Sequence, residues 1–336
     1  MTFESGKKRP RVVSGIQPSG RLHIGNYIGA LSQWVENQER FDNLLFIADL
    51  HALTAPGEVK AKELRRNAVE AAGLYVACGI DPERSLIFLQ SDVPEHAYLA
   101  WILTCCTPVG WLERMIQFKT KSEGKERVGA GLLTYPVLQA ADILVYHADY
   151  VPVGEDQKQH VEITRDIAER FNHLFGAYFK TPEPYIPKVG ARIMGLDNPE
   201  VKMSKSLAEN SRTHAIGLLD PPNVVKKAIS SAPTDSKPGV DFDETSPGVS
   251  NLLTIFRCFS GVGDVELRST FEGKSYGFLK KELTEVVNER LSAIQTRYEE
   301  LVRSGGLEQL LREGAERARE TAGKTLREVR ELTGVG

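Results

Sequence analysis

Short apolar runs alternate with longer stretches of helical periodicity along the first half of the chain. The runs are bounded by turn residues and predict buried β-strands at Val12–Ile16, Leu44–Ala48, Leu86–Leu89 and Tyr150–Val153. Apolar residues that recur every three or four positions predict helices at Ala61–Val76, Leu132–His147 and Asp156–Phe171. Because strands and helices alternate, we predict an α/β fold with a mostly parallel sheet and helices on both of its faces.

Polar or small residues stand where these strands end. Gln17, Asp49, Gln90 and Gly154 each lie at or just past the end of a predicted strand. Ligands of such sheets bind at the carboxyl ends of the strands. A binding site is therefore expected along that edge.

The pattern changes beyond Ser206. Residues 232–239 and 246–248 are rich in Pro, Gly and Ser and predict loops, whereas the chain from Lys280 onward has the pattern of long amphipathic helices of mixed charge. We therefore predict two domains, a catalytic one over residues 1–212 and an all-helical one over residues 213–336.

Composition narrows the class of protein. The chain has 336 residues, a net charge of −3, 41% hydrophobic and 26% charged residues, which is typical of a globular protein with a sizeable core. A near-neutral charge does not indicate a nucleic-acid binder, although a basic stripe can coexist with an acidic remainder. No apolar run approaches the roughly 20 residues of a membrane span, and the basic start Lys7–Arg11 precedes too few apolar residues for a signal peptide. We expect a cytoplasmic protein.

The four cysteines lack the spacing of a metal site. Two are adjacent and none forms a Cys-x-x-Cys pair, so neither a zinc set nor a disulfide framework is indicated. We interpret them as buried small apolar residues and expect no structural metal. They are Cys78, Cys105, Cys106 and Cys258.

The first candidate motif, Pro18–Asn26, lies between the first predicted strand and a helical pattern that extends to Trp34. Such a junction directs backbone N–H groups and the positive end of a helix at a phosphate. Its glycines allow close approach of a nucleotide, and His23 supplies a ring N–H. Alone, such a segment is more often a tight turn with a capping Asn and a surface His.

The second candidate motif is Lys202–Ser206, in a polar region that predicts a loop. Two lysines three residues apart, with serines between and after them, form a flexible cationic segment suited to following a departing phosphate. Alone, such a segment is usually solvated surface. The two motifs gain weight from occurring together, in this order, with an α/β pattern between them.

Together these motifs resemble the two signatures of the class I aminoacyl-tRNA synthetases, and more narrowly those of the bacterial members specific for tryptophan. The resemblance implies a Rossmann-like catalytic domain that binds ATP, a helical domain that contacts the tRNA anticodon and a last helix that folds back on the catalytic domain. It also implies a homodimer. Further matching segments are Ser14–Gly20, Gly25–Ala30, Gly131–Pro136, Ala140–Leu144, Val151–Gln157 and Lys188–Met194.

The resemblance implies a two-step reaction. L-Tryptophan and ATP form tryptophanyl-adenylate and pyrophosphate, and tryptophan then passes to the terminal adenosine of its tRNA. Mg²⁺ is expected to bridge the ATP phosphates rather than sit in a protein cage. Three residues are expected to face phosphate as catalytic groups: His23, Lys202 and Lys205. The remaining expected ATP-binding residues are Gln17, Pro18, Ser19, Gly25, Asn26, Gly154, Glu155, Asp156, Ile193, Met203, Ser204 and Ser206. Lys121 is a further candidate phosphate contact, and an equally good candidate for solvated surface.

Asp142 carries the prediction of amino-acid specificity. It lies within the apolar run Leu138–Val145, where a carboxylate needs a partner unless it points to solvent. The resemblance supplies the partner, because the corresponding Asp accepts the indole N–H of tryptophan. The other residues expected around the amino acid are Gly15, His51, Tyr135, Gln139, Val151, Val153 and Gln157. Gln139 replaces a methionine common in the family, which alters the apolar packing expected there.

Three alternatives remain at this stage. A tyrosine-specific synthetase shares the fold and both motifs. A small nucleotidylyltransferase performs similar adenylyl chemistry but lacks the second motif and the helical tail. A catalytically idle relative would bind tRNA or protein, and is disfavoured because both motifs are intact.

Overall fold

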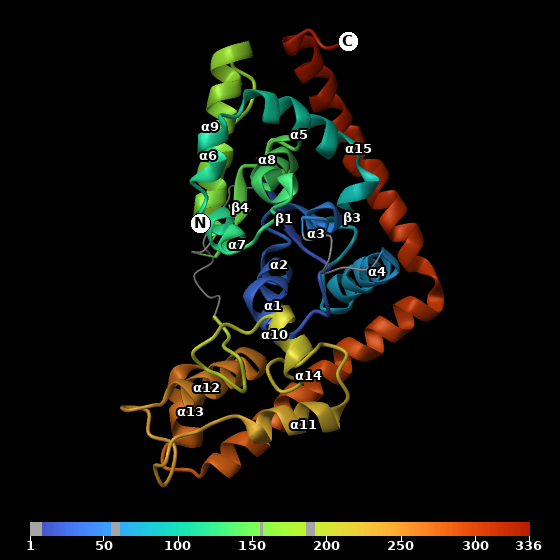
Figure 1. Cartoon of the computed structure of the whole chain (residues 1–336). Helices are drawn as coiled ribbons and strands as arrows, with labels where there is room; N and C mark the ends of the chain where they lie inside the picture. Colours follow the sequence, from blue (N-terminus) through green and yellow to red (C-terminus); the bar gives the residue numbers. More distant parts are fainter. Residues whose placement is uncertain (1–8, 55–60, 155–156, 186–191) are drawn as a thin grey trace.

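A parallel sheet forms the centre of the molecule. We describe a computed structural model of the chain over residues 9–54, 61–154, 157–185 and 192–336 (Figure 1). Within these ranges five strands pair in the order β3-β2-β1-β4-β5, and every pairing is parallel. The strands are β1 (Arg11–Ile16), β2 (Asp42–Ile47), β3 (Ser85–Leu89), β4 (Tyr150–Pro152) and β5 (Glu183–Tyr185). The predicted α/β fold with a parallel sheet is confirmed.

Helices connect the strands and form the C-terminal third. Those of the first half are α1 (Ile24–Asn26), the π-helix η1 (Tyr27–Leu31), α2 (Ser32–Asn37), α3 (Asp49–Ala52), α4 (Ala61–Ala77), the 3₁₀-helix η2 (Gln90–Asp92), α5 (Glu95–Cys106), α6 (Val109–Glu113), α7 (Ile116–Ser122) and α8 (Ala130–Leu144). Those of the second half are α9 (Lys158–Phe175), α10 (Lys205–Asn210), α11 (Pro222–Ser231), α12 (Pro247–Ser260), α13 (Asp264–Phe271), α14 (Tyr276–Ser304) and α15 (Gly306–Thr333).

Successive residues of the central strands feed two different cores. Leu45 and Ile47 of β2 belong to a core that also contains residues of α1, α4, α11, α12 and α14. Leu44 and Phe46 point the other way, into a core built with α5, α8, α9 and the end of α15. A strand with both faces covered has no polar face, which explains its continuous apolar run. The C-terminal helices thus share a core with one face of the sheet, and the division at residue 212 stays a prediction.

Most predicted elements lie where expected, and the differences have local causes. The predicted helix Leu132–His147 ends at Leu144, because His147 adopts a left-handed φ of 50°. The strand β5 was not predicted, since Pro184 interrupts its short sequence and lacks a backbone N–H, which suits an edge strand. The loop predicted to run through 248 ends at Ser246, whose side chain caps α12 ahead of a proline in the first turn.

The two longest helices, α14 and α15, are joined at Gly305. This residue has a φ of 71°, a left-handed conformation that glycine adopts without strain. α15 then runs along one side of the molecule and packs against β3 and α5 (Figure 1). At Gly314 the approach is so close that a Cβ atom would lie 1.9 Å from the Ile87 carbonyl oxygen. The edge strand of the sheet is therefore covered by the last helix.

One prediction about the cysteines is wrong in part. Cys78 and Cys106 are buried, but Cys105 is exposed on α5 and Cys258 is half-buried. In the described ranges, no helix is both long enough and apolar enough to cross a membrane.

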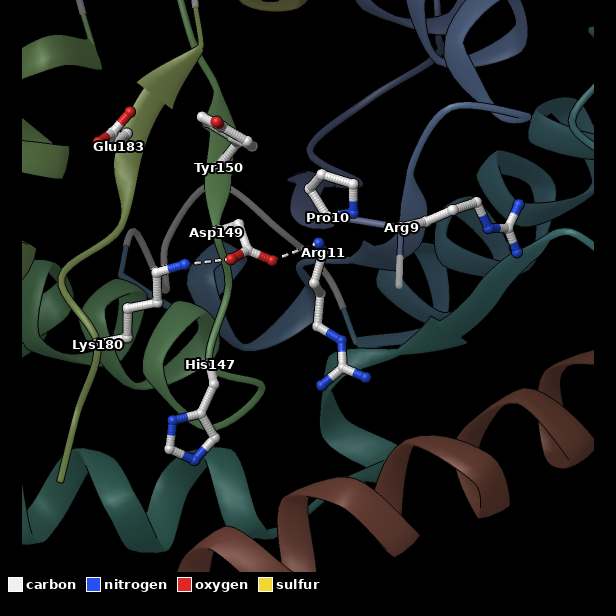
Figure 2. A pocket seen from close by; sticks show the side chains of 8 residues that line it. All are labelled: Arg9, Pro10, Arg11, His147, Asp149, Tyr150, Lys180 and Glu183. Carbon is white, nitrogen blue, oxygen red and sulfur yellow. Dashed lines mark hydrogen bonds and ion pairs between the residues drawn. The ribbon is translucent and has the colours of Figure 1, made fainter. Parts of the chain in front are cut away.

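A cavity of about 430 Å³ opens at the amino ends of β1, β4 and β5 (Figure 2). The Asp149 carboxylate stands in it between the Lys180 ammonium and the Arg11 backbone N–H. The Arg11 guanidinium is paired with Asp42 and the Tyr146 carbonyl. This cavity lies at the edge opposite to the predicted site, and these charges are already compensated. The candidate site is therefore at the carboxyl edge.

Candidate active site

The first motif places His23 at the start of α1, directly after the loop that follows β1. The side-chain oxygen of Asn26 accepts a hydrogen bond from the His23 backbone N–H (3.1 Å), which fixes the turn. The imidazole is only 5% exposed, and its Nδ1 has no hydrogen-bond partner among the described residues. Gly25 permits this position, since a Cβ there would lie 3.0 Å from the ring. The alternative of a surface histidine is therefore wrong.

The second motif is only partly a loop. Met194 and Lys202 form an antiparallel bridge, and the Met203 N–H donates to the Ile193 carbonyl (3.0 Å). Met203 is buried, with its sulfur facing Gly25 of the first motif. The predicted loop ends at Ser204, whose hydroxyl caps α10, so that Lys205 and Ser206 are the first helical residues. We call the bridged segment from Ile193 to Met203 the lysine hairpin. Lys202 is exposed on this hairpin, whereas Lys205 lies just beyond it, at the start of α10.

Lys205 joins the two motifs. Its Nζ donates a hydrogen bond to the Gln17 carbonyl (2.7 Å), 188 positions earlier in the chain. Burial lowers the pKa of Lys205 to about 8. The pKa of His23 falls to about 3 because of burial and the nearby positive charges of Lys205, His214 and Lys202. Within the described ranges no carboxylate pairs with Lys205, and such a cluster of cationic and donor groups suits a polyanionic ligand.

The other predicted ATP-site residues occupy the same edge of the sheet or its loops. Pro18 and Ile193 are buried, whereas Gln17, Ser19 and Gly154 are exposed at the ends of β1 and β4. Glu155 and Asp156 lie outside the described residues. Lys121 is exposed on α7.

Asp142 lies on α8 and is 1% exposed, so the alternative that it points to solvent is wrong. Its Oδ1 accepts hydrogen bonds from Gln90 Nε2 (2.7 Å) and His96 Nδ1 (2.6 Å), and its Oδ2 accepts one from His51 Nε2 (2.8 Å). Burial alone would raise the pKa of Asp142, but the bonds from His51 and His96 outweigh it and lower the pKa to about 2. The carboxylate is therefore ionised.

Some of the other residues predicted around the amino acid are linked to this carboxylate, either by a direct bond or through a neighbouring side chain. The Tyr135 ring meets the His51 ring edge-on at 6.4 Å, and its hydroxyl shares a hydrogen bond with His160 Nε2 (2.7 Å). Gly15 is exposed on β1, where a Cβ would collide with the Phe46 ring at 2.7 Å. Val151 and Val153 are buried near the end of β4, and Gln139 and Gln157 are half-buried. The structure thus brings His51 to Asp142 directly, and Tyr135 to the His51 ring.

Comparison with known proteins decides the family. The family model of class I tRNA synthetases for tryptophan and tyrosine matches residues 5–292. The chain belongs to the class I aminoacyl-tRNA synthetases. It is 52% identical to the tryptophan–tRNA ligase of Caldanaerobacter subterraneus over 97% of this chain and 98% of that one. It is 51% identical to the tryptophan–tRNA ligase of Bacillus subtilis, with 97% and 98% of the chains covered.

Solved structures agree with these relatives. The tryptophanyl-tRNA synthetase of Mycoplasma pneumoniae matches at a TM-score of 0.88 with 37% identity, over 98% of this chain and 99% of that one. The enzyme of Campylobacter jejuni, solved with ADP and tryptophan, matches at a TM-score of 0.84 with 38% identity, over 97% and 100%. The resemblance to bacterial tryptophan-specific synthetases is confirmed.

Sequence reasoning missed several residues around the candidate site. Gln90 was noted only as a strand end, and His96 not at all, although both donate to Asp142. Asn251 of α12 was also missed: its amide accepts from the Met194 N–H (2.9 Å) and donates to the Met194 carbonyl (3.0 Å). The signal for His96 was a histidine in the first turn of an otherwise apolar helix. No local pattern marks Asn251, since it acts 57 residues away.

Proposed function

We propose that this synthetase activates L-tryptophan with ATP and transfers it to the terminal adenosine of tRNA(Trp), with Asp142 as the group that selects tryptophan. An ionised carboxylate has about four acceptor positions, and the described residues occupy three of them. The fourth, on Oδ2, is available for the indole N–H. This single observation carries the proposal, and the identity with tryptophan–tRNA ligases along the whole chain supports it.

The chemistry of selection follows from burial. Phenylalanine would leave the Oδ2 acceptor of the buried Asp142 unpaired, and that costs binding energy. Tyrosine differs from tryptophan in ring size and shape. Gly15, Val151 and Val153 would form the walls around the indole, while Tyr135 and Gln157 would hold the α-amino group. Gln139 adds a polar side chain to the same surroundings.

Activation requires charge to be stabilised on phosphate oxygens. The tryptophan carboxylate attacks the α-phosphorus of ATP, and negative charge grows on the leaving pyrophosphate. Lys205 would exchange the Gln17 carbonyl for this charge, so its contribution grows toward the transition state. Lys202, on the exposed side of the hairpin, adds a second charge. His23, neutral at physiological pH, would donate one hydrogen bond from its ring.

ATP enters as its magnesium complex. Residues 17–26 and 202–206 contain no Asp or Glu, so neither motif offers Mg²⁺ a carboxylate cage. Mg²⁺ keeps phosphate and water ligands readily. In this proposal the metal stays on the phosphates, while the protein supplies cations and N–H donors around them.

The remaining assignments concern partners. The helical region from residue 213 onward would contact the tRNA anticodon, and the enzyme would work as a cytoplasmic homodimer. Exposed apolar side chains on α5 to α7, among them Trp101 and Ile116, are candidates for the subunit interface. Trp111 and Leu112 of the same region lie half-buried and buried, and belong to the fold.

ATP–pyrophosphate exchange without tRNA tests the proposal. We expect exchange with tryptophan, and none with tyrosine, phenylalanine or no amino acid. Asp142→Asn keeps the side-chain shape and removes the charge, so tryptophan-dependent exchange should fall steeply. Exchange with tyrosine would overturn the specificity, and exchange that survives in the variant would remove Asp142 from recognition. Charging of tRNA(Trp) transcripts then tests the second step.

A further inference from the structure

We propose that His96, held in place by Tyr146, is a specificity-positioning residue: it locks the Asp142 carboxylate in the ionised form and orientation that accepts the indole N–H. Neither residue touches the substrate in this proposal. The inference rests on the proposed function, because it concerns how Asp142 comes to select tryptophan.

The hydrogen bonds on Asp142 are distributed unevenly between its two oxygens. Oδ1 accepts from Gln90 and His96, which fills both of its acceptor positions, whereas Oδ2 accepts only from His51 among the described residues. Two bonds on one oxygen restrain rotation of the carboxylate about its Cβ–Cγ bond. The open position is therefore held on Oδ2, the oxygen that also accepts from His51.

His96 is itself held by a hydrogen bond on the side of its ring that faces away from Asp142. Its Nδ1 faces Asp142, and its Nε2 shares a hydrogen bond with the Tyr146 hydroxyl (2.7 Å). Since an ionised carboxylate only accepts, the proton must be on Nδ1. The imidazole is fully buried, with the rings of Phe46, Phe88 and Tyr146 around it at 5.3 to 6.1 Å between centroids. Each ring nitrogen has one defined partner.

The fold makes this arrangement rigid. His96 lies in the first turn of α5, and Tyr146 lies in the turn after α8, four residues beyond Asp142. α5 and α8 pack directly against each other. Tyr146 is fully buried, and its backbone carbonyl accepts from the Arg11 guanidinium (2.8 Å), which ties that turn to β1. The chain of hydrogen bonds from Tyr146 through His96 to Asp142 is therefore anchored on α5, α8 and β1.

Loss of His96 has a specific consequence in this arrangement. A buried carboxylate that loses one of its donors takes up a proton more readily and can rotate. A protonated or rotated Asp142 no longer demands an N–H from the substrate. Selection between tryptophan and a ring of the same shape without the N–H should then weaken, which is not expected from a purely structural role.

The test compares tryptophan with 3-benzothienylalanine, whose sulfur replaces the indole N–H. For each enzyme, kcat and KM in ATP–pyrophosphate exchange give the preference ratio of the two substrates. We expect His96→Leu to lower the preference for tryptophan by roughly 10- to 100-fold, through a rise in the KM for tryptophan. His96→Asn should restore most of it, since the Asn amide can place a donor near the position of Nδ1. Tyr146→Phe removes the support with little change in volume and should reduce the preference by a smaller factor.

Phe88→Leu is the matched control, because it loosens packing against the His96 ring without removing a hydrogen bond. Its preference ratio should equal that of the unchanged enzyme. Equal losses for both substrates in His96→Leu, or an unchanged ratio in both His96→Leu and Tyr146→Phe, would overturn the inference. If His96→Leu does not fold, Tyr146→Phe decides it, because an unchanged ratio in that variant would then overturn the inference. Failure of the unchanged enzyme to activate tryptophan would instead refute the proposed function.

Discussion

The ammonium of Lys205 donates to the backbone carbonyl of Gln17 at 2.7 Å. This bond joins the two motifs, and it gives the partly buried lysine a hydrogen-bond acceptor. A carbonyl is a weaker partner for an ammonium than a phosphate. Arrival of ATP can therefore draw Lys205 away from Gln17 at small cost.

Lys205→Ala should slow activation far more than it weakens tryptophan binding. One charge that acts mainly in the transition state typically contributes about 10²- to 10³-fold in rate, and the proposed tryptophan site around Asp142 does not include this lysine. Pre-steady-state adenylate formation gives the rate, and titration calorimetry gives tryptophan affinity. Lys180→Ala is the control, since Lys180 lies at the opposite edge of the sheet. An unchanged rate would exclude Lys205 from the mechanism.

ATP binding should be coupled to proton uptake above pH 8. Burial lowers the pKa of Lys205 to about 8, so part of the population is neutral at pH 8.5. A bound polyphosphate favours the charged form and raises this pKa, so protons are taken up on binding above pH 8 and not below pH 7. Calorimetry in buffers of different ionisation enthalpy measures the uptake directly. Lys205→Ala should abolish it; uptake that persists in the variant would assign it to another group.

The sequence predicted those parts of the candidate site that are marked by a local sequence pattern. The glycine-containing turn at Pro18–Asn26 and the acidic residue within an apolar helix at Asp142 both carry local signals. By contrast, the bonds of Asp142 to Gln90 and His96 join strand ends and helices that only the sheet order brings together. The strand β5 was missed for a related reason, since three residues with a proline have no periodicity.

The link between α12 and the second motif should matter for activation. Asn251 uses both halves of its amide on Met194, whose neighbour Ile193 pairs with Met203 in the lysine hairpin. Asn251→Asp keeps the acceptor, loses the donor and adds a buried charge. We expect a loss of roughly 1–3 kcal/mol in stability and a lower activation rate at unchanged tryptophan affinity.

A comparison within α12 separates this effect from general destabilisation. Thr254→Ala removes a hydroxyl that donates to the Ser250 carbonyl in its own helix (2.8 Å), so it should leave the activation rate intact. Urea unfolding gives the stability of both variants. If Asn251→Asp loses stability but activates tryptophan normally, the Asn251 amide stabilises the fold but does not position the hairpin for activation.

Two glycines of α15 differ in how closely the rest of the protein approaches them, so their replacement by alanine should have opposite effects on stability. A Cβ at position 314 would lie 1.9 Å from the Ile87 carbonyl oxygen, a backbone atom that cannot move aside, whereas at Gly323 the nearest atoms are flexible side-chain ends at 3.6 Å or more. Gly314→Ala should therefore destabilise the fold by about 1–3 kcal/mol as the helix shifts off the strand. Gly323→Ala should stabilise it by up to about 1 kcal/mol, because alanine favours the helix. Urea unfolding of the two variants side by side checks the sign of each effect. Equal changes would mean that helix propensity, rather than contact with β3, governs how α15 is held.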